Sequence, residues 1–292
     1  MLVSMAEILK DAKKRNYGVA APNIFNKETI EAAYEAADEL KSPVILDFAG
    51  LKDQEIITEI SKYYERKYPH VVAALNLDHG GSYEEIVAAI RAGFTSVMID
   101  RSKLPYKQNV EEVKEIVKIA HHVGVSVEAE LGHVGMGYEY ESTRDSGLTK
   151  PEEAINYIEK TGVDCLAVAV GTSHGTYSGE PHLEFELLEK LNSMIDIPLV
   201  LHGGSGTGDE NLKKAVKIGI QKVNLFTDLS NAGLGVLKDY LMIDRTKMEH
   251  DRELGEFGNK NANLIETFLK GTEGYKQALK HYMTLFESNG KC

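Results

Sequence analysis

The sequence predicts a closed barrel of eight parallel strands surrounded by helices, and two observations support this fold class. The first is a repeated junction, in which a helical pattern ends on a glycine and a short apolar strand follows. The second is the alternation of apolar runs with helical patterns, which is typical of a parallel sheet buried on both faces. Eight runs favour a TIM barrel, and an open doubly wound sheet is the alternative. The junction glycines are Gly93, Gly124, Gly162 and Gly219.

The predicted strands are short and mostly apolar, and helical patterns with recognisable starts separate them. Asn26 precedes a pattern whose apolar residues recur every three or four positions. Ser82 and Glu85 have the spacing of a capping box, and Thr149 and Glu152 repeat that spacing. We interpret the apolar faces of these helices as core. The predicted strands are residues 17–21, 43–48, 71–77, 95–100, 126–130, 164–170, 197–201 and 221–225.

We expect residues 1–292 to form a single domain. Residues 240–261 are mostly polar and charged, which is typical of a solvated helical extension or of a contact between subunits. Residues 132–150 are too long and too rich in glycine and tyrosine for a simple turn, which indicates a mobile loop at an active site.

The composition excludes several classes of protein. The chain has 292 residues, of which 42 % are hydrophobic, enough to bury a full core. Its 45 acidic and 33 basic residues give a net charge of −12, which argues against a nucleic acid or an anionic membrane as partner. Two cysteines, Cys165 and Cys292, fit a reducing compartment. With no signal-peptide pattern and no long apolar stretch, we expect a cytoplasmic protein.

Three histidines follow predicted strands at the end where a TIM barrel carries its chemistry. His79, His174 and His202 come after strands three, six and seven, and each is followed by a glycine. They are far apart in the sequence and converge only if the barrel closes. Three neutral imidazoles leave a fourth position open on zinc, as in catalytic zinc sites. We therefore predict a catalytic zinc ion with these three ligands.

Carboxylates stand at the same strand ends. Asp78 precedes a predicted zinc ligand, so it is a candidate to exchange a proton with a hydroxyl near a metal-bound carbonyl; the alternative is that it orients a histidine. Asp100 and Glu130 end strands four and five, and we expect them to orient a histidine or to form an alternative metal position. Glu128 points the same way as Glu130, and we prefer Glu130 because it lies at the strand end.

Two loops predict a phosphate site. Residues 202–206, with the sequence HGGSG, follow strand seven, and residues 224–228 follow strand eight. In a TIM barrel these loops commonly bind phosphate, because bare backbone N–H groups and a helix N-terminus surround the dianion there.

Four motifs appear at these strand ends in a characteristic order. They are NLDHG at residues 76–80, VEAELG at 127–132, GTSHGTYS at 171–178 and LHGGSG at 201–206. As a set, with APNIFN at residues 21–26, they resemble the class II, zinc-dependent ketose-bisphosphate aldolases, which act on fructose or tagatose 1,6-bisphosphate. The resemblance extends from about residue 4 to residue 227.

The resemblance implies roles for individual residues. The three histidines would bind zinc, and Asp78 would exchange the proton of the C4 hydroxyl. Asn23 and Asn224 would contact the dihydroxyacetone-phosphate portion of the substrate. The family also uses a glutamate on the loop after strand five to handle the proton on the carbon beside the ketone, and the nearest candidates are Glu139 and Glu141. The residues that would hold the phosphate, near a monovalent cation (Na⁺ or K⁺), are Gly175, Gly203, Ser205 and Thr227.

The chain also departs from the family pattern. Residues 135–138 read GMGY where a Gly-Gly pair is usual, and Phe226 replaces a small or acidic residue. Near the C-terminus, where the family places an arginine for the distal phosphate, the chain has only Lys280 and Lys291, which lack the bidentate fork of arginine. Residues 177–178, Tyr-Ser, lean towards the tagatose-type branch.

We therefore expect reversible cleavage of a ketose 1,6-bisphosphate to dihydroxyacetone phosphate and glyceraldehyde 3-phosphate, by a homodimer or homotetramer. A lysine Schiff base is disfavoured, because no predicted strand ends in lysine and Lys222 lies at the opposite end of strand eight. The alternatives are an aldolase for another, or a singly, phosphorylated ketose, a metal-dependent hydrolase on the same barrel, and a non-catalytic partner subunit.

Overall fold

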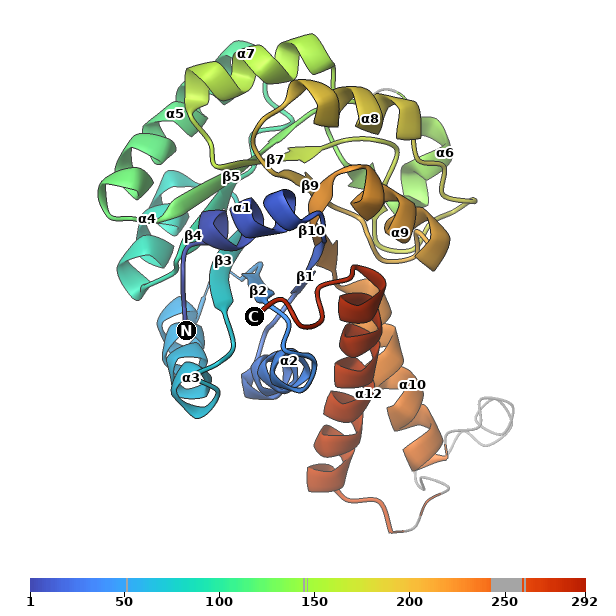
Figure 1. The fold of residues 1–292 in the computed structure, drawn as a ribbon. Helices are drawn as coiled ribbons and strands as arrows, with labels where there is room; N and C mark the ends of the chain where they lie inside the picture. Colours follow the sequence, from blue (N-terminus) through green and yellow to red (C-terminus); the bar gives the residue numbers. More distant parts are fainter. Residues whose placement is uncertain (51, 144, 146, 243–258, 260) are drawn as a thin grey trace.

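Eight parallel strands form the centre of the molecule and helices surround them (Figure 1). The computed structural model describes residues 1–50, 52–143, 145, 147–242, 259 and 261–292. The strands pair in the order β1-β10-β9-β7-β5-β4-β3-β2. They are β1 (Val19–Pro22), β2 (Val44–Phe48), β3 (Ala73–Gly80), β4 (Ser96–Ile99), β5 (Ser126–Leu131), β7 (Cys165–Val168), β9 (Leu199–Leu201) and β10 (Ile220–Leu225).

The first and second strands close the barrel. Asn23, directly after β1, forms a parallel bridge with Asp47 of β2, and the N–H of Ile24 donates to the carbonyl of Asp47 at 2.8 Å. The sheet therefore has the nearly closed arrangement of a TIM barrel, and the predicted fold class is confirmed.

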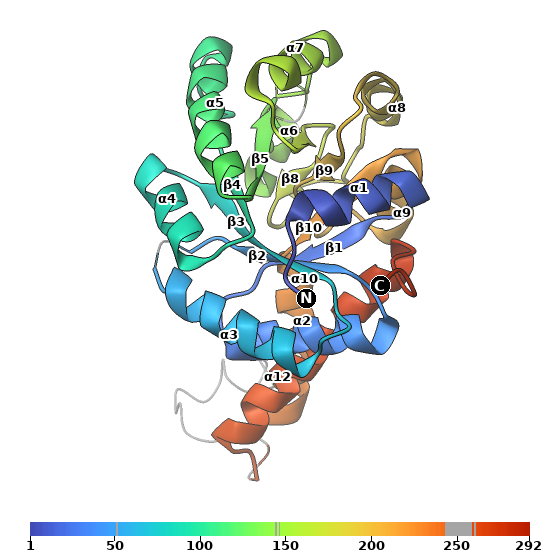
Figure 2. The ribbon, with the colours of Figure 1, turned by 60° about the vertical axis from the view of Figure 1, so that its left-hand side comes forward.

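Helices connect successive strands and cover the outer face of the barrel (Figure 2). None of the described helices is long and apolar enough to span a bilayer. Around the barrel lie α2 (Lys27–Leu40), α3 (Gln54–Lys67), α4 (Tyr83–Ala92), α5 (Tyr106–His122), α7 (Pro151–Thr161), α8 (Phe185–Met194) and α9 (Asp209–Ile218). A small second layer above the rim consists of β6 (Gly135–Met136), η1 (Gly137–Glu139), α6 (Tyr140–Thr143) and β8 (Ser173–His174).

The predicted helix boundaries are largely as expected, with one exception. The side chains of Asn26 and Ser82 accept hydrogen bonds from the N–H groups of Thr29 and Glu85, at 3.0 and 3.2 Å. The predicted capping box at Thr149 is wrong, because α7 begins after Lys150 without a side-chain cap. Thr149 is buried instead, where its hydroxyl donates to a carbonyl of β5 and accepts an N–H that follows β7.

Helix α1 (Met5–Arg15) closes the amino-terminal end of the barrel. Its apolar face packs against residues at or near the starts of several strands, among them Val19, Ala74 and Cys165. Met5 and Leu9 are fully buried in this contact. The opposite end of the barrel remains available for a ligand.

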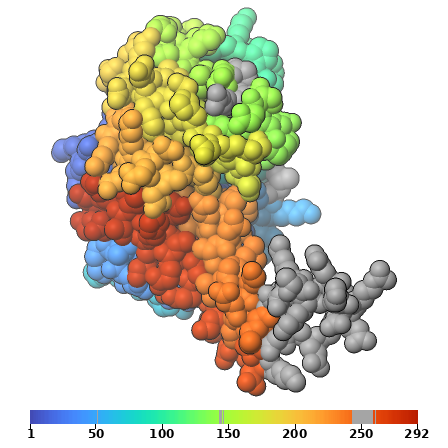
Figure 3. Space-filling model, turned by 90° about the vertical axis from the view of Figure 1, so that its right-hand side faces the viewer, coloured from blue at the N-terminus to red at the C-terminus, as the bar shows by residue number. Residues whose placement is uncertain are grey.

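Helices α10 (Thr227–Leu241) and α12 (Leu264–Leu285) lie side by side and project from the barrel (Figures 1 and 3). Helix α12 also packs against α2 and β1. The predicted polar extension at residues 240–261 lies mostly outside the described residues. Near its start, α12 exposes four apolar side chains, of Leu264, Ile265, Phe268 and Leu269.

We expect Leu9→Ala to lower the free energy of unfolding by about 2–5 kcal/mol, because the substitution leaves a cavity in the fully buried contact beneath the barrel. Lys10→Ala, on the exposed side of the same helix, is the matched control and should change stability by about 0.5 kcal/mol or less. Urea denaturation followed by circular dichroism measures both. Equal stabilities would show that α1 is not part of the cooperative core.

Candidate active site

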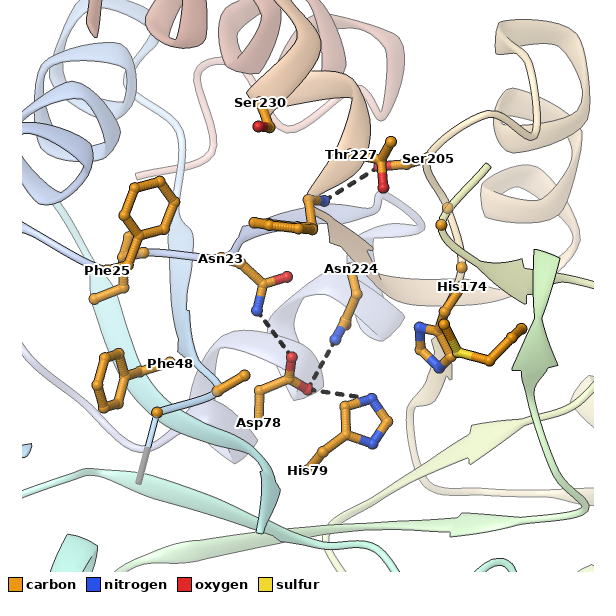
Figure 4. A pocket seen from close by; sticks show the side chains of 18 residues that line it. Asn23, Phe25, Phe48, Asp78, His79, His174, Ser205, Asn224, Thr227 and Ser230 are labelled. Atoms are coloured by element: carbon orange, nitrogen blue, oxygen red, sulfur yellow. Dashed lines mark hydrogen bonds and ion pairs between the residues drawn. The ribbon is translucent and has the colours of Figure 1, made fainter. Parts of the chain in front are cut away.

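A cavity of about 630 Å³ opens at the carboxyl ends of the strands (Figure 4). This is the end of a TIM barrel at which active sites are found. Most of the residues that the sequence singled out therefore lie around one space. The predicted site residues that line it are Asn23, Asp78, His79, His174, Gly175, Gly203, Ser205, Asn224 and Thr227.

An irregularity in β3 brings two consecutive side chains to the cavity. In a regular strand Asp78 and His79 would point to opposite faces. The pairing of β3 with β4 shifts register between Leu77 and Gly80, and His79 has a φ of +53°, in the left-handed region. Such bulges and strained residues cluster at functional sites, where they re-aim side chains. Here the bulge lets both Asp78 and His79 line the cavity.

The three predicted zinc ligands converge. The ring centroids of His79 lie 5.0 Å from His174 and 4.7 Å from His202, and the His174 and His202 rings are 5.7 Å apart. Nε2 of His79 lies 3.0 Å from Nδ1 of His202. One nitrogen from each ring lies within 4.8 Å of the others, close enough to share an ion. A second group around His79 includes Asp100 and Glu130.

Two carboxylates orient the histidines from behind. Asp100 contacts Nδ1 of His79 at 2.9 Å, and Glu128 contacts Nε2 of His202 at 2.7 Å. An ionised carboxylate only accepts, so these two ring nitrogens carry hydrogens and the opposite ones present lone pairs. Two lone pairs 3.0 Å apart require a shared proton or a cation between them. The donor set therefore fits a bound metal ion, and imidazole nitrogens suit zinc.

The charges around the cluster also favour a cation. Burial lowers the pKa of His79, but Asp78, Asp100 and Glu130 outweigh it and raise the pKa to about 10. Burial, reinforced by the other two histidines, lowers the pKa of His174 to about 4, so this ring is neutral at pH 7, as a metal ligand must be. Oε2 of Glu130 is buried without a hydrogen-bond partner among the described residues.

Asp78 is fixed by amides on two sides (Figure 4). Nδ2 of Asn23 donates to Oδ2 at 2.9 Å and Nδ2 of Asn224 donates to Oδ1 at 3.1 Å, while Nε2 of His79 lies 3.8 Å from Oδ1. Burial raises the pKa of Asp78, but its electrostatic interactions with His79, His202 and Lys222 hold it below its usual range. The side chain is therefore an ionised, pre-oriented acceptor beside the metal position.

The glycine-rich loops meet at the N-terminus of α10. Gly203 has a φ of +68°, and a Cβ there would lie 2.4 Å from the carbonyl oxygen of Ser173, so only glycine fits. Oγ of Ser205 accepts from the N–H groups of Phe226 and Asp228 at 3.1 and 3.2 Å, which joins the loop after β9 to the start of α10. Backbone N–H groups at a helix N-terminus suit a phosphate.

Tyrosines from outside the predicted site brace these loops. Oη of Tyr177 donates to the carbonyl of Gly203 at 3.0 Å and accepts from the N–H of Ser173 at 2.9 Å. In the sequence, Tyr177 is notable only as a marker of a family branch. On α12, Oη of Tyr282 donates to Asp228 at 2.6 Å, and Oη of Tyr275 donates to the carbonyl of Asn23 at 2.8 Å. No local motif identifies these contacts, because they join distant segments.

Four residues proposed from the resemblance lie away from the cavity. Glu139 and Glu141 are exposed and do not line it. Lys280 forms an ion pair with Glu39 on α2. Nζ of Lys291 lies over the ring of a tyrosine near the N-terminus, 5.5 Å from its centroid. None of the described lining residues is lysine or arginine.

Lys222 is closer to the site than its place in the sequence indicated. It is fully buried inside the barrel, and its Nζ lies 2.9 Å from Oε2 of Glu128, the carboxylate that contacts His202. Its place at the strand end favours Glu130 in the sequence, yet Glu128 is the residue that contacts a predicted ligand. The alternation of Glu128 and Glu130 along β5 was the signal that both side chains face inwards.

Comparisons with known proteins agree with this geometry. The sequence matches the family described as "Fructose-bisphosphate aldolase class-II" over residues 3–291. It is similar to the fructose-bisphosphate aldolase of Thermus caldophilus, with 37 % identity over an alignment of 324 residues that covers 100 % of both proteins.

Solved structures of similar proteins share the fold. The YdjI aldolase from Escherichia coli K12 superposes with a TM-score of 0.83 at 30 % identity, covering 100 % of this chain and 99 % of that one. A putative fructose-1,6-biphosphate aldolase from Coccidioides immitis gives a TM-score of 0.80 at 24 % identity, with 98 % and 97 % covered, and this likeness concerns the fold alone. With its barrel and the family match along nearly its whole length, the chain belongs to the class II fructose-bisphosphate aldolase family and is an aldolase, a carbon–carbon lyase.

Proposed function

We propose that this aldolase uses zinc to cleave a ketose 1,6-bisphosphate, fructose or tagatose, reversibly into dihydroxyacetone phosphate and glyceraldehyde 3-phosphate. The observation that carries the proposal is the convergence of three imidazoles, two of them oriented by carboxylates, beside the pre-oriented carboxylate of Asp78. His79, His174 and His202 would hold the ion. When bound, zinc supplies a Lewis acid that stabilises the negative charge which develops on the ketone as the carbon–carbon bond breaks.

Asp78 would take the proton of the C4 hydroxyl during cleavage and return it during synthesis. Its position supports this role, because both of its oxygens are held by amide donors and neither forms an ion pair with a lysine or arginine among the described residues. Asn23 and Asn224 would then hold Asp78 and contact the dihydroxyacetone-phosphate portion together.

The phosphate of that portion would lie between the two loops at the start of α10. Gly175, Gly203 and Thr227 line the cavity there, and Ser205 keeps a hydroxyl hydrogen to donate while its oxygen accepts two backbone N–H groups. The net charge of −12 makes local backbone donors more important for holding a dianion. A monovalent cation, Na⁺ or K⁺, would complete this site.

Glu139 and Glu141 remain the candidates for the base that handles the proton beside the ketone. Both are exposed and lie outside the cavity, so either one would reach the substrate only after η1 and α6 turn towards it. Tyr140, between them, is fully buried, and its hydroxyl donates to the carbonyl of Gly171 at 3.0 Å. Such a movement would therefore have to break this contact or pivot about it.

A singly phosphorylated ketose is the second candidate substrate, and the lining of the cavity favours it. Phe25, Phe48 and Phe226 line the cavity, and Lys280, proposed for the distal phosphate, is paired with Glu39. Aromatic rings suit the carbon face of an uncharged group better than a second dianion.

We further propose that residues 1–292 act as one domain, and that the protein is a cytoplasmic homodimer or homotetramer. The packing of α12 against α2 and β1 supports a single domain. The unpaired cysteines, Cys165 and Cys292, are compatible with a reducing compartment. The exposed apolar side chains near the start of α12 support self-association.

A chelator should abolish cleavage, and added zinc should restore it, because the bound ion would supply the Lewis acid that stabilises the carbanion. Sodium borohydride with substrate should trap no adduct. Lys222 stays protonated between Asp47 and Glu128, since these carboxylates outweigh burial and raise its pKa above its usual range, and a protonated amine cannot form a Schiff base. Coupled-enzyme assays and intact-protein mass spectrometry measure the two effects. A trapped adduct, or full activity without metal, would refute the metal-dependent mechanism.

Asp78→Ala should retain zinc but reduce kcat by about 10²- to 10⁴-fold, the usual contribution of a positioned acid–base group. The test combines metal analysis of the purified variant with steady-state kinetics on fructose and tagatose 1,6-bisphosphate and on their 1-phosphates. The same panel of sugar phosphates identifies the substrate. A variant with the rate of the unaltered enzyme would leave Asp78 a purely structural role.

Phe268→Asp should dissociate or weaken the oligomer, because it places a charge within the exposed apolar group of α12. Light scattering after gel filtration measures the mass. Gln277→Asp, at an exposed position on the same helix, is the control for the added negative charge. If both variants keep the mass of the unaltered protein, the subunits associate through another surface.

A further inference from the structure

A chain of buried charged groups connects the predicted zinc ligand His202 with the far side of the barrel interior. Nε2 of His202 contacts Oε1 of Glu128 at 2.7 Å, and Oε2 of Glu128 accepts from Nζ of Lys222 at 2.9 Å. The same ammonium lies 3.0 Å from Oδ2 of Asp47, whose Oδ1 accepts from Nδ2 of Asn76 at 2.9 Å. All five side chains are fully buried.

The three charged members come from strands that do not neighbour one another. Asp47 lies on β2, Glu128 on β5 and Lys222 on β10, and neither β2 nor β10 pairs with β5 in the sheet. The lysine therefore bridges the interior of the barrel beneath the cavity. Buried charges in such a place are strongly destabilising unless each has a partner, so the arrangement is costly to keep without a use.

The geometry gives each oxygen of Glu128 a different task. Lysine has three donors and no acceptor, so Oε2 is held as an acceptor by Lys222. Oε1 is then aimed at His202 and accepts its Nε2 hydrogen. With the hydrogen on Nε2, the lone pair of His202 lies on Nδ1, the nitrogen that faces His79. The orientation of one metal ligand thus depends on a lysine that touches neither the ligand nor the cavity.

We propose that Lys222 is a positioning residue for the metal site. Lys222 holds Glu128, and Glu128 fixes the ring and the tautomer of His202 so that Nδ1 points to the ion. Asp47 anchors the lysine from the other side and offsets its charge. This role rests on the proposed zinc function, and its test includes a measurement that requires no metal.

The first test uses Glu128→Gln, which keeps the size of the side chain and leaves Lys222 paired with Asp47. Lys222 should attract the amide oxygen, so that the amide nitrogen faces His202 and donates to Nε2. The hydrogen of His202 then moves to Nδ1. This nitrogen thereby loses the lone pair with which it would bind the ion. Nitrogen NMR of the metal-free, ¹⁵N-histidine-labelled chain distinguishes the tautomers, with His202 assigned from its missing signals in His202→Gln. An unchanged Nε2–H tautomer in Glu128→Gln would overturn the proposal.

The second test compares Lys222→Met/Asp47→Asn with Asp47→Asn alone. The double variant removes the buried pair of Lys222 and Asp47 as a whole, and the single variant keeps the contact between Lys222 and Glu128. Zinc affinity is measured by competition with a chromophoric chelator, and the cobalt-substituted chains are compared by their visible absorption. The double variant should bind zinc about 10- to 100-fold more weakly than the single variant, the usual effect of losing a group that orients a metal ligand.

Equal affinities and equal cobalt spectra for these two variants would overturn the role of Lys222, even if Glu128→Gln weakens binding. Thermal unfolding followed by circular dichroism establishes that each variant is folded; if the double variant is not, the tautomer in Glu128→Gln decides. If the unaltered chain binds no zinc, the proposed function fails, and the tautomer measurement still tests the positioning role separately.

Discussion

The balance of charge inside the barrel is the constraint on which the site depends. Several carboxylates at the ends and in the middle of strands point into the barrel, where they are buried from water. Lys222 offsets the charges of Glu128 and Asp47, whereas Asp78, Asp100 and Glu130 surround a histidine and raise its pKa. An excess of negative charge around neutral nitrogen donors is an environment that a divalent cation satisfies. The carboxylates that no lysine balances therefore favour a cation beside the three histidines.

Much of the fold could be predicted because periodicity and helix ends record it directly. The glycines at 93 and 162 end helices with positive φ angles, and the strands that follow them are in place. Sequence could not reveal the bulge at His79, because an alternating pattern assumes regular strands. The sequence also misassigned Thr149 as a helix cap. The spacing of a capping box is equally compatible with a threonine that hydrogen-bonds to the ends of two strands.

The site could be predicted only as far as strand ends determine it. The three histidines and Asp78 follow from closure of the barrel, which collects residues that are distant in the chain. The partners that orient them depend on depth along a strand, which alternation does not resolve, as the choice between Glu128 and Glu130 shows. Positions on loops and on the last helix, such as those of Glu139 and Lys280, depend on tertiary contacts that no local pattern encodes.

Helix α12 has a consequence for when the site becomes complete during synthesis. Its tyrosines, Tyr275 and Tyr282, hydrogen-bond to the backbone of Asn23 and to Asp228, so α12 braces both the end of the first strand and the start of α10, where phosphate binding is predicted. Strand β1 likewise finds its partner β10 only late in the chain. A nascent polypeptide from which α12 has not yet emerged therefore lacks these contacts, and the proposed site is complete only once that helix has docked.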